Sequence, residues 1–253
     1  MEYHKLPPVE DLRRMYFDEN LSTTKIANIY GSSHNAVNLK LRRAGYILRG
    51  LSDSQLLNSL HITLTHELRE RLDGLLLGDG CISLAPTKKS ACYCHTDKHE
   101  EYILWLQNEL LVLGFEGITI RKHSTQNCYS LRTRYYPELI DIRKRWYPNN
   151  KKQLPMDFKI SPIALFDFYI GDGNYNKGKN NTKKGESVRI AMYFDSYGRL
   201  RLIDMLKKLG INATEQRKQI YIRADSRDKF FNYISIKKIP VSYQYKFPQG
   251  VII

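Results

Sequence analysis

The 253-residue sequence has few cysteines, fewer acidic than basic residues, and no long hydrophobic run. Its four cysteines do not suggest a disulfide framework, because the chain is long and no signal peptide precedes them. No apolar stretch approaches the ~20 residues that a membrane-spanning helix needs. We therefore expect a soluble, intracellular protein that works in a reducing compartment and has no membrane partner.

Zinc is the one metal centre that the cysteines themselves suggest. Cys92, Cys94 and His95 lie together, and His99 follows closely. Alternating residues of a strand do not have the pitch of the usual Cys-x2-Cys knuckle, and no second cysteine pair follows. The spacing therefore disfavours zinc.

The shortage of acidic residues leaves a strong and uneven positive charge. The chain has 40 Lys and Arg against 26 Asp and Glu, for a net charge of +14. Residues 51–116 contain 5 basic and 10 acidic side chains, whereas residues 174–253 contain 17 basic and 6 acidic ones. A basic excess interleaved with 18 tyrosines suits a polyanion, nucleic acid first. On charge alone, the alternative is a basic protein that is merely soluble.

Two segments carry the most specific signal, Leu72–Gly80 (LDGLLLGDG) and Leu165–Gly173 (LFDFYIGDG). Each is an apolar run that ends in Gly-Asp-Gly, and Asp79 and Asp172 lie 93 residues apart. Apolar runs need burial, so both predict core helices, yet each places one carboxylate at the negative end of a helix dipole. A divalent cation reverses that penalty. If the two helices pack side by side, the aspartates meet at one end of the seam and form a metal site.

The two segments resemble the paired motifs of the LAGLIDADG homing endonucleases, in the single-chain form that carries both copies. The resemblance extends over about residues 65–250 and implies an α+β fold. In that fold an αββαββα unit is pseudo-duplicated and forms saddle-shaped antiparallel sheets. The resemblance also implies a monomer that cuts both strands of double-stranded DNA at a long specific site and promotes intron or intein mobility. Two or more Mg²⁺ ions are the implied cofactors, with Ca²⁺ binding without supporting cleavage.

The residues around the two motifs support a duplication. In each half, the pattern predicts a motif helix, a hairpin, a second helix, another hairpin and a third helix. In the second half a strand is expected over residues 188–194 and the second helix over residues 200–209. Gly114 and Gly210 end the second helices at similar distances from the two aspartates. We expect a linker over residues 51–64, a first repeat over 65–159 and a second over 160–253.

Residues 1–50 predict a separate small all-α unit. A short helix is expected before a tight turn at Gly31, and a second helix over about His34–Arg43, capped by Ser32 or Ser33. This order resembles a helix-turn-helix domain whose second helix reads DNA. A three-helix packing module is the alternative. The expected DNA contacts are Asn35, Asn38, Lys40, Arg42 and Arg43.

The motif aspartates are the expected catalytic metal ligands. Phosphodiester hydrolysis needs an activated water, stabilisation of negative charge and help for the leaving oxygen, and paired hard cations supply all three. Asp79 and Asp172 would each serve one strand, with backbone carbonyls of Gly78 and Gly171 completing the coordination. The alternative is that each aspartate merely ends a helix before a glycine.

The resemblance assigns two lysines near the scissile phosphates. The segment YPNNKKQLP resembles the lysine-bearing segment of the first half, which makes Lys152, or else Lys151, the candidate. The segment YKF resembles the closing motif of the second half, which makes Lys246 the candidate, with Lys238 as the alternative. A positive charge there can stabilise the transition state.

Two further catalytic candidates lie at strand ends. YCHT resembles a strand end where the family usually has Gln-Ser, and FDSY takes the corresponding place in the second half. His95 and Asp195 are therefore implied to orient water or metal. A histidine in place of glutamine departs from the family pattern, and a sugar-phosphate contact or an ordinary strand-end histidine fits His95 equally well.

Base reading is expected from basic residues on strands, because a two-stranded ribbon fits the major groove and arginine reads guanine. The sequence does not fix which face each strand residue takes. The stretch Asn176–Glu186 is expected to form a hairpin tip that holds the phosphate backbone. The strand candidates are Arg121, Arg132, Arg134, Arg189, Arg217, Lys218 and Arg223, and the tip candidates are Lys177, Lys183 and Lys184.

These features together favour a site-specific, metal-dependent DNA endonuclease. One rival is a nucleic-acid binder of the same fold without cleavage, such as an intron maturase or a transcription regulator. Another is a transcription factor led by the N-terminal unit. Both Asp79 and Asp172 favour the enzyme, because a protein that only binds does not need them.

Overall fold

The computed structural model describes residues 6–50, 60–177, 185–234 and 238–248. The chain forms two compact units, Met1–Ser59 and Leu60–Ile253. No helix within the described ranges is both long and apolar enough to cross a membrane.

The N-terminal unit is helical. Helix α1 (Val9–Arg13) continues into the π-helical turn η1 (Arg14–Asp18), and α2 (Thr23–Ile29) and α3 (His34–Arg43) follow. Apolar residues from all of these elements form its core, as the helical spacing predicts. These core residues are Leu12, Tyr16, Ile26, Ala27, Val37 and Leu41.

The turn between α2 and α3 has the local features that the sequence predicts. Gly31 has a φ of +59°, a conformation that glycine adopts without steric cost. Of the two candidate caps for α3, Ser33 is the one used, because its hydroxyl accepts a hydrogen bond from Ala36 N at 3.2 Å. The unit therefore has the two helices and the tight turn that the sequence predicts, and a helix-turn-helix domain that binds DNA stays a prediction.

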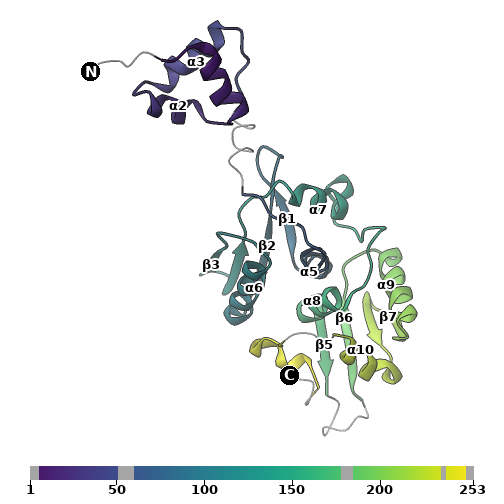
Figure 1. The fold of residues 1–253 in the computed structure, drawn as a ribbon. Coiled ribbons are helices and arrows are strands. Elements are labelled where there is room, and N and C mark those ends of the chain that lie inside the picture. Colours follow the sequence, from purple (N-terminus) through teal and green to yellow (C-terminus); the bar gives the residue numbers. More distant parts are fainter. Residues whose placement is uncertain (1–5, 51–59, 178–184, 235–237, 249–253) are drawn as a thin grey trace. The chain divides into compact units, whose positions relative to one another are not determined.

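The larger unit contains the same series of seven elements twice (Figure 1). The first series is α5 (His66–Leu77), β1 (Cys81–Leu84), β2 (Ala91–Asp97), α6 (Glu100–Val112), β3 (Thr119–His123), β4 (Cys128–Arg132) and α7 (Leu139–Trp146). The second series is α8 (Pro162–Asp172), β5 (Gly173–Asn176), β6 (Ser187–Ala191), α9 (Ser196–Lys208), β7 (Ala213–Gln216), β8 (Gln219–Ile222) and α10 (Arg227–Ile234). Short 3₁₀ turns complete the described elements: η2 (Pro148–Asn150), η4 (Ala224–Ser226) and η5 (Val241–Lys246).

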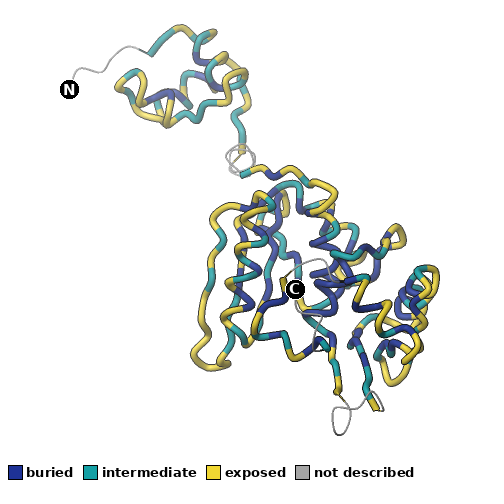
Figure 2. The backbone as a smooth tube through the Cα atoms, turned by 60° about the horizontal axis from the view of Figure 1, so that its bottom comes forward, coloured by how far each residue is buried: buried dark blue, intermediate teal, exposed yellow. Residues whose placement is uncertain are grey.

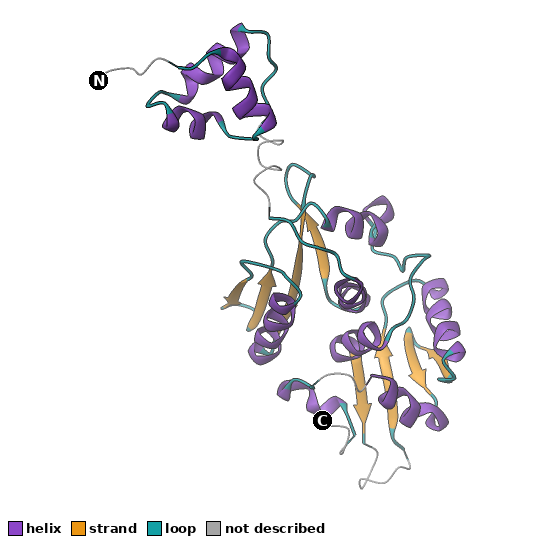
Figure 3. Cartoon of the chain, viewed as in Figure 1, coloured by secondary structure: helices purple, strands orange, loops and turns teal. Residues whose placement is uncertain are grey.

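Each repeat builds one four-stranded antiparallel sheet (Figure 3). The strand orders match, β1-β2-β4-β3 and β5-β6-β8-β7, so the two repeats share one topology. The pairing places His95 opposite Leu131 in the first sheet and Ile190 opposite Ile220 in the second. In the second sheet the buried residues of β6 and β8 alternate with more exposed ones, so one face lies on the core and the other is more exposed. The predicted α+β fold with a duplicated αββαββα unit is confirmed.

The motif helices α5 and α8 pack against each other between the two sheets (Figure 1). Both are buried over most of their length, and the tube through the middle of the larger unit is mostly coloured as buried (Figure 2). A methyl group placed on Gly74 would lie only 2.4 Å from the carbonyl oxygen of Ala164, so the backbones approach as closely as a missing side chain permits. Thr65 and Ser161 cap the N-termini of the two helices, each accepting from the backbone N–H three residues later.

The structure departs from the predicted boundaries in the second repeat. The strand predicted over residues 188–194 ends at Ala191, and the helix predicted from Leu200 begins four residues earlier at Ser196. The reason is local: the Asp195 side chain accepts a hydrogen bond from Gly198 N at 2.8 Å and so starts the helix.

Candidate active site

The C-terminal ends of α5 and α8 bring the two motif aspartates together. A methyl group placed on Gly78 would lie 3.0 Å from Asp172 Oδ2, so the carboxylate of the second motif lies against the first motif. Asp79, the next residue after Gly78, is exposed, whereas Asp172 is partly buried. The two sites are therefore related by the repeat but differ in their exposure to solvent.

The electrostatics of Asp172 reflect this position. Burial and the neighbouring charge of Asp79 raise the pKa of the Asp172 carboxyl to about 7, while Lys246 and Lys152 act in the opposite direction. An ionised Asp172 is thus disfavoured when only protein surrounds it. A bound cation would stabilise the ionised form.

Lys152 contacts the C-terminal end of the first motif. Its ammonium donates to the carbonyl oxygens of Gly78 at 2.6 Å and Gly80 at 2.8 Å. Burial lowers the pKa of Lys152, and the carboxylates of Asp172 and Asp79 act in the opposite direction. Its alternative, Lys151, is exposed.

Lys246 makes the matching contact in the second motif. Its ammonium donates to the carbonyl oxygens of Ile170 at 2.5 Å and Gly171 at 2.8 Å. Burial lowers the pKa of Lys246 to about 8, with Asp172 the largest opposing influence. Tyr169 also donates to the carbonyl oxygen of Lys246 at 2.6 Å, and the alternative Lys238 is exposed. The glycine carbonyls predicted as metal ligands, those of Gly78 and Gly171, are therefore the ones that the two lysines bind.

His95 is a buried histidine of β2. Its Nδ1 lies 2.9 Å from the hydroxyl of Tyr93, and its side chain faces the core. Burial lowers the pKa of His95 to about 4, although Asp97 and Asp79 favour the charged form. The imidazole is therefore neutral at pH 7, which suits a polar contact better than a charged one.

Asp195 does not occupy the position in its repeat that His95 occupies in the first. His95 lies within β2, four residues before His99 at the N-terminus of α6, whereas Asp195 itself caps α9. Asp195 lines a surface cavity of about 360 Å³ together with Lys151, Lys152 and Lys218. Asp195 is thus close to Lys152. The segments YCHT and FDSY follow the same order along the chain, but His95 and Asp195 do not occupy equivalent positions in the fold.

A buried ion pair crosses the helix seam, and the sequence did not lead us to expect it. Arg71 of α5 donates to Asp167 of α8 at 2.7 Å and to Glu109 of α6 at 2.6 Å. The side chains of Arg71 and Asp167 are almost fully buried. Arg71 and Ala164 each lie eight residues before their motif aspartate, and Gly74 and Asp167 each lie five before. The repeat therefore relates two contacts across the seam. Gly74 meets Ala164 in one of them, and Arg71 pairs with Asp167 in the other.

The strand and turn candidates for base reading lie mainly at the surface. Arg132 pairs across the first sheet with Cys94, and Arg189 of β6 lies with its guanidinium 5.6 Å from the centre of the Tyr221 ring. Arg217 and Lys218 form the β7–β8 turn, both with positive φ. The exposed members of the set are Arg121, Arg132, Arg134, Arg217, Lys218 and Arg223, whereas Arg189 is partly buried.

The other predicted DNA contacts vary in their surroundings. Lys177 is exposed, and Lys183 and Lys184 lie outside the described residues. In the N-terminal unit, Asn35, Arg42 and Arg43 are exposed and Asn38 is partly buried. Lys40 instead donates to the carbonyl oxygens of Leu6 and Pro7, at 3.2 and 2.6 Å.

Three of the four cysteines, Cys81, Cys92 and Cys94, form a thiol cluster on neighbouring strands of the first sheet. Cys92 Sγ lies 3.7 Å from Cys94 Sγ and 3.3 Å from Arg132 Nε. Cys81 pairs with Cys94 across β1 and β2, and none of the four cysteines is in a disulfide. Over the part of the chain that the structure describes, no group of three or more His, Cys, Asp or Glu side chains is arranged to hold a metal ion.

Comparison with known proteins places these features in a family. Residues 69–230 match the LAGLIDADG DNA endonuclease family. The uncharacterized protein MJ1098 of Methanocaldococcus jannaschii is 26% identical over 243 residues, covering 91% of this chain and 92% of that protein. The cytochrome b mRNA maturase bI2 of Debaryomyces hansenii is 28% identical over 140 residues, covering 51% of this chain and 50% of the maturase.

A solved structure shares the fold. The homing endonuclease I-WcaI, bound to its DNA recognition sequence, superposes with a TM-score of 0.58 at 20% sequence identity. The match covers 78% of this chain and 92% of I-WcaI. The family resemblance expected from the two Gly-Asp-Gly segments is confirmed, and the chain belongs to the LAGLIDADG DNA endonuclease family.

Proposed function

We propose that this protein is a site-specific endonuclease that hydrolyses both strands of double-stranded DNA with the help of divalent cations. The observation that carries the proposal is the pairing of Asp79 and Asp172 at one end of a helix seam, each flanked by a lysine on the adjacent carbonyls. A fold that serves only to bind DNA gains nothing from two carboxylates whose charges repel each other.

The donor groups fit a hard cation such as Mg²⁺. Asp79 and Asp172 offer carboxylate oxygens, and the carbonyls of Gly78 and Gly171 lie beside them. Burial and the charge of Asp79 raise the pKa of Asp172 despite the nearby Lys246 and Lys152, and a bound cation would favour the ionised form. When bound there, Mg²⁺ would activate water and stabilise the negative charge that develops on the phosphate.

The residues of the chain itself would orient the DNA and manage charge. Lys152 and Lys246 place one ammonium at each half of the site, where a positive charge can stabilise a pentavalent phosphate. His95, from its buried position beside Tyr93, and Asp195, from the cavity it shares with Lys152, are proposed to orient water or metal. Since the carbonyls bound by the lysines are also the candidate cation ligands, the lysines would need to shift as the cation and DNA bind.

DNA is proposed to lie along the free faces of the two sheets. Arg132 and Arg189 project from those faces, and the Arg217–Lys218 turn borders the second sheet. The N-terminal unit, with Asn35, Asn38, Lys40, Arg42 and Arg43 on or beside α3, is proposed to lengthen the recognised site. I-WcaI, which shares the fold, was solved on its DNA recognition sequence, and this supports the same class of partner here.

Nucleic-acid binding without cleavage, as in an RNA maturase, is the second candidate. It is favoured by the similarity of half of this chain to the bI2 maturase. Intron homing and maturase activity are separable, and both motif aspartates are retained here.

Comparison of Mg²⁺ with Ca²⁺ tests the proposal. Duplexes that the protein binds in Ca²⁺ would be selected from a randomised library, and Mg²⁺ would then be added to the complexes. We expect sequence-specific binding in both ions and double-strand cleavage in Mg²⁺ alone. Stable binding of a defined duplex with no strand broken in Mg²⁺ or Mn²⁺ would favour the second candidate.

A further inference from the structure

Neither catalytic lysine lies on one of the seven helices and strands that make up its repeat. Lys152 lies in the segment between η2 and α8, which connects the two repeats. Lys246 is the last residue of η5, beyond the last helix of the second repeat. Long lysine side chains on such segments need other contacts to fix them, because ordering each one costs conformational entropy.

The segment that carries Lys246 is held by the first repeat, in addition to the contact that Tyr169 of its own repeat makes. The carboxylate of Glu101, in the first turn of α6, accepts from Val241 N at 3.2 Å and from Ser242 N at 3.0 Å. It also accepts from Ser242 Oγ at 2.5 Å. One side chain of the first repeat therefore binds the whole start of η5 through hydrogen bonds to an ionised acceptor.

Tyr243 extends this contact to the lysine itself. Its hydroxyl donates to Asp97 at the end of β2, and its ring packs edge-on against Tyr102 of α6 with centroids 4.9 Å apart. On the same ring, Lys246 Nζ lies 4.4 Å from the centroid. The first repeat thus reaches the ammonium of Lys246 through a single tyrosine.

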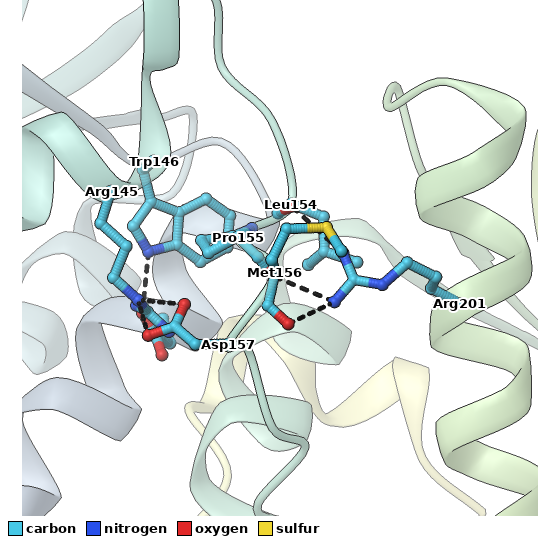
Figure 4. Close-up of polar contacts among 8 residues, drawn as sticks. Arg145, Trp146, Leu154, Pro155, Met156, Asp157 and Arg201 are labelled. Atoms are coloured by element: carbon cyan, nitrogen blue, oxygen red, sulfur yellow. Dashed lines mark hydrogen bonds and ion pairs between the residues drawn. The ribbon is translucent and has the colours of Figure 1, made fainter.

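The segment that carries Lys152 is held from both repeats (Figure 4). From the first repeat, the carbonyl oxygen of Trp146 accepts from Gln153 N at 2.8 Å, and Arg145 donates to Asp157 at 2.8 Å. Arg201 of α9 donates to three successive backbone carbonyls: Leu154 at 3.4 Å, Pro155 at 3.1 Å and Met156 at 2.9 Å. Leu154 is two residues from Lys152 and is buried. The guanidinium therefore fixes the backbone just beyond the lysine.

We propose that the opposite repeat completes the positioning of each catalytic lysine: Glu101 and, through Tyr243, Asp97 act on Lys246, and Arg201 acts on Lys152. Neither half-site is then complete until both repeats have packed, which couples cleavage of the two strands to the intact seam. This inference rests on the proposed nuclease function for its catalytic consequence. The positioning contacts themselves can be tested without cleavage.

Strand-resolved cleavage of an end-labelled duplex tests the Lys246 contact. Lys246→Met identifies the strand that its half-site cuts. We expect Glu101→Ala, an exposed position, to slow cleavage of that same strand by about ten- to one-hundred-fold, because small displacements of a catalytic group are costly. Glu100→Ala is the matched control, since Glu100 is the exposed neighbour on the same helix, and it should cut both strands at the normal rate.

Loss of the Lys152 contact should slow cleavage of the other DNA strand. Arg201→Gln should slow the strand that Lys152→Met slows, with KM for DNA nearly unchanged, while Lys207→Gln on the same helix serves as the control. A general loss of stability would slow both strands alike. Equal slowing of the two strands by Glu101→Ala and Arg201→Gln would therefore overturn the proposal.

Lysine labelling gives a readout that does not need nuclease activity. Reductive methylation of the metal-free protein, mapped by mass spectrometry, should modify Lys246 several-fold faster in Glu101→Ala and Lys152 several-fold faster in Arg201→Gln. Each variant should leave the other lysine unchanged. If labelling changes as expected but no variant and no wild-type protein cuts DNA, the proposed function fails and the positioning contacts stand. If labelling of both lysines is unchanged in both variants, the positioning proposal fails.

Discussion

Replacement of Asp172 by asparagine should stabilise the metal-free protein while it removes a proposed metal ligand. Burial and the charge of Asp79 raise the pKa of Asp172 from 3.8 to about 7. The folded protein therefore holds the proton of this carboxyl more tightly than the unfolded chain does. Above pH 7 the folded state must carry an ionised carboxylate that its surroundings disfavour.

The magnitude and the pH window follow from that shift. A difference of about three pKa units corresponds to an upper limit of about 4 kcal/mol, at about 1.4 kcal/mol for each unit. Because the folded-state pKa is raised, the penalty is complete above pH 7, diminishes as the pH falls, and is absent below pH 4. We expect Asp172→Asn to raise the free energy of unfolding by about 2–4 kcal/mol at pH 8 and by much less at pH 5.

Urea denaturation with EDTA present, at pH 5 and pH 8, measures both values. Asp228→Asn is the control, because Asp228 is an exposed aspartate outside the site. In wild-type protein at pH 8, Mg²⁺ should restore stability, and in Asp172→Asn it should have little effect. A variant that is no more stable than wild type at pH 8, or equally stabilised at both pH values, would refute the electrostatic account of the site.

Three further changes test the seam and the N-terminal unit. Gly74→Ala should destabilise the protein by about 2–3 kcal/mol or more in urea denaturation, because the added methyl group meets the carbonyl of Ala164 at 2.4 Å; a normal midpoint would contradict the close approach. Arg71→Met should lower the free energy of unfolding by about 3–5 kcal/mol, because it leaves Asp167 buried without its cation. The double variant Arg71→Met, Asp167→Leu should recover most of that loss. Equal losses in the single and double variants would contradict this. Removal of residues 1–59 should leave a folded nuclease with a smaller footprint on DNA. In a filter-binding titration it should bind DNA more weakly and with a flatter salt dependence. Unchanged affinity and salt slope would mean that the unit does not contact DNA.

The parts of the fold that the sequence predicted correctly are those with local signals. The motif helices combine a capping residue at Thr65 or Ser161, an apolar run and a closing glycine, and the sequence alone contains all three. The paired strands whose residues alternate between buried and exposed also carry a local signal, the alternation of apolar and polar residues. Short polar strands such as β5 (GNYN) carry no such pattern, and β5 exists because it pairs with β6.

The contacts that were missed depend on residues far apart in the chain. Arg71 and Asp167 are charged residues near or within apolar motif segments, which is a sign that each needs a partner, but only the seam shows that they partner each other. Glu101 and Ser242 are separated by 141 positions, and nothing in either local sequence predicts that one binds the other. His95 and Asp195 do not occupy equivalent positions in the two repeats, because the connection from strand to helix is longer in the second repeat than in the first.

Cleavage by the two aspartate variants on one selected DNA target tests the central claim most directly. A supercoiled plasmid that carries the target would be incubated with wild type, Asp79→Asn or Asp172→Asn in Mg²⁺, and binding would be followed in parallel in Ca²⁺. We predict that the wild type linearises the plasmid, and that each variant binds it but makes no double-strand break. Full linearisation by either variant would contradict a catalytic site built from these two carboxylates.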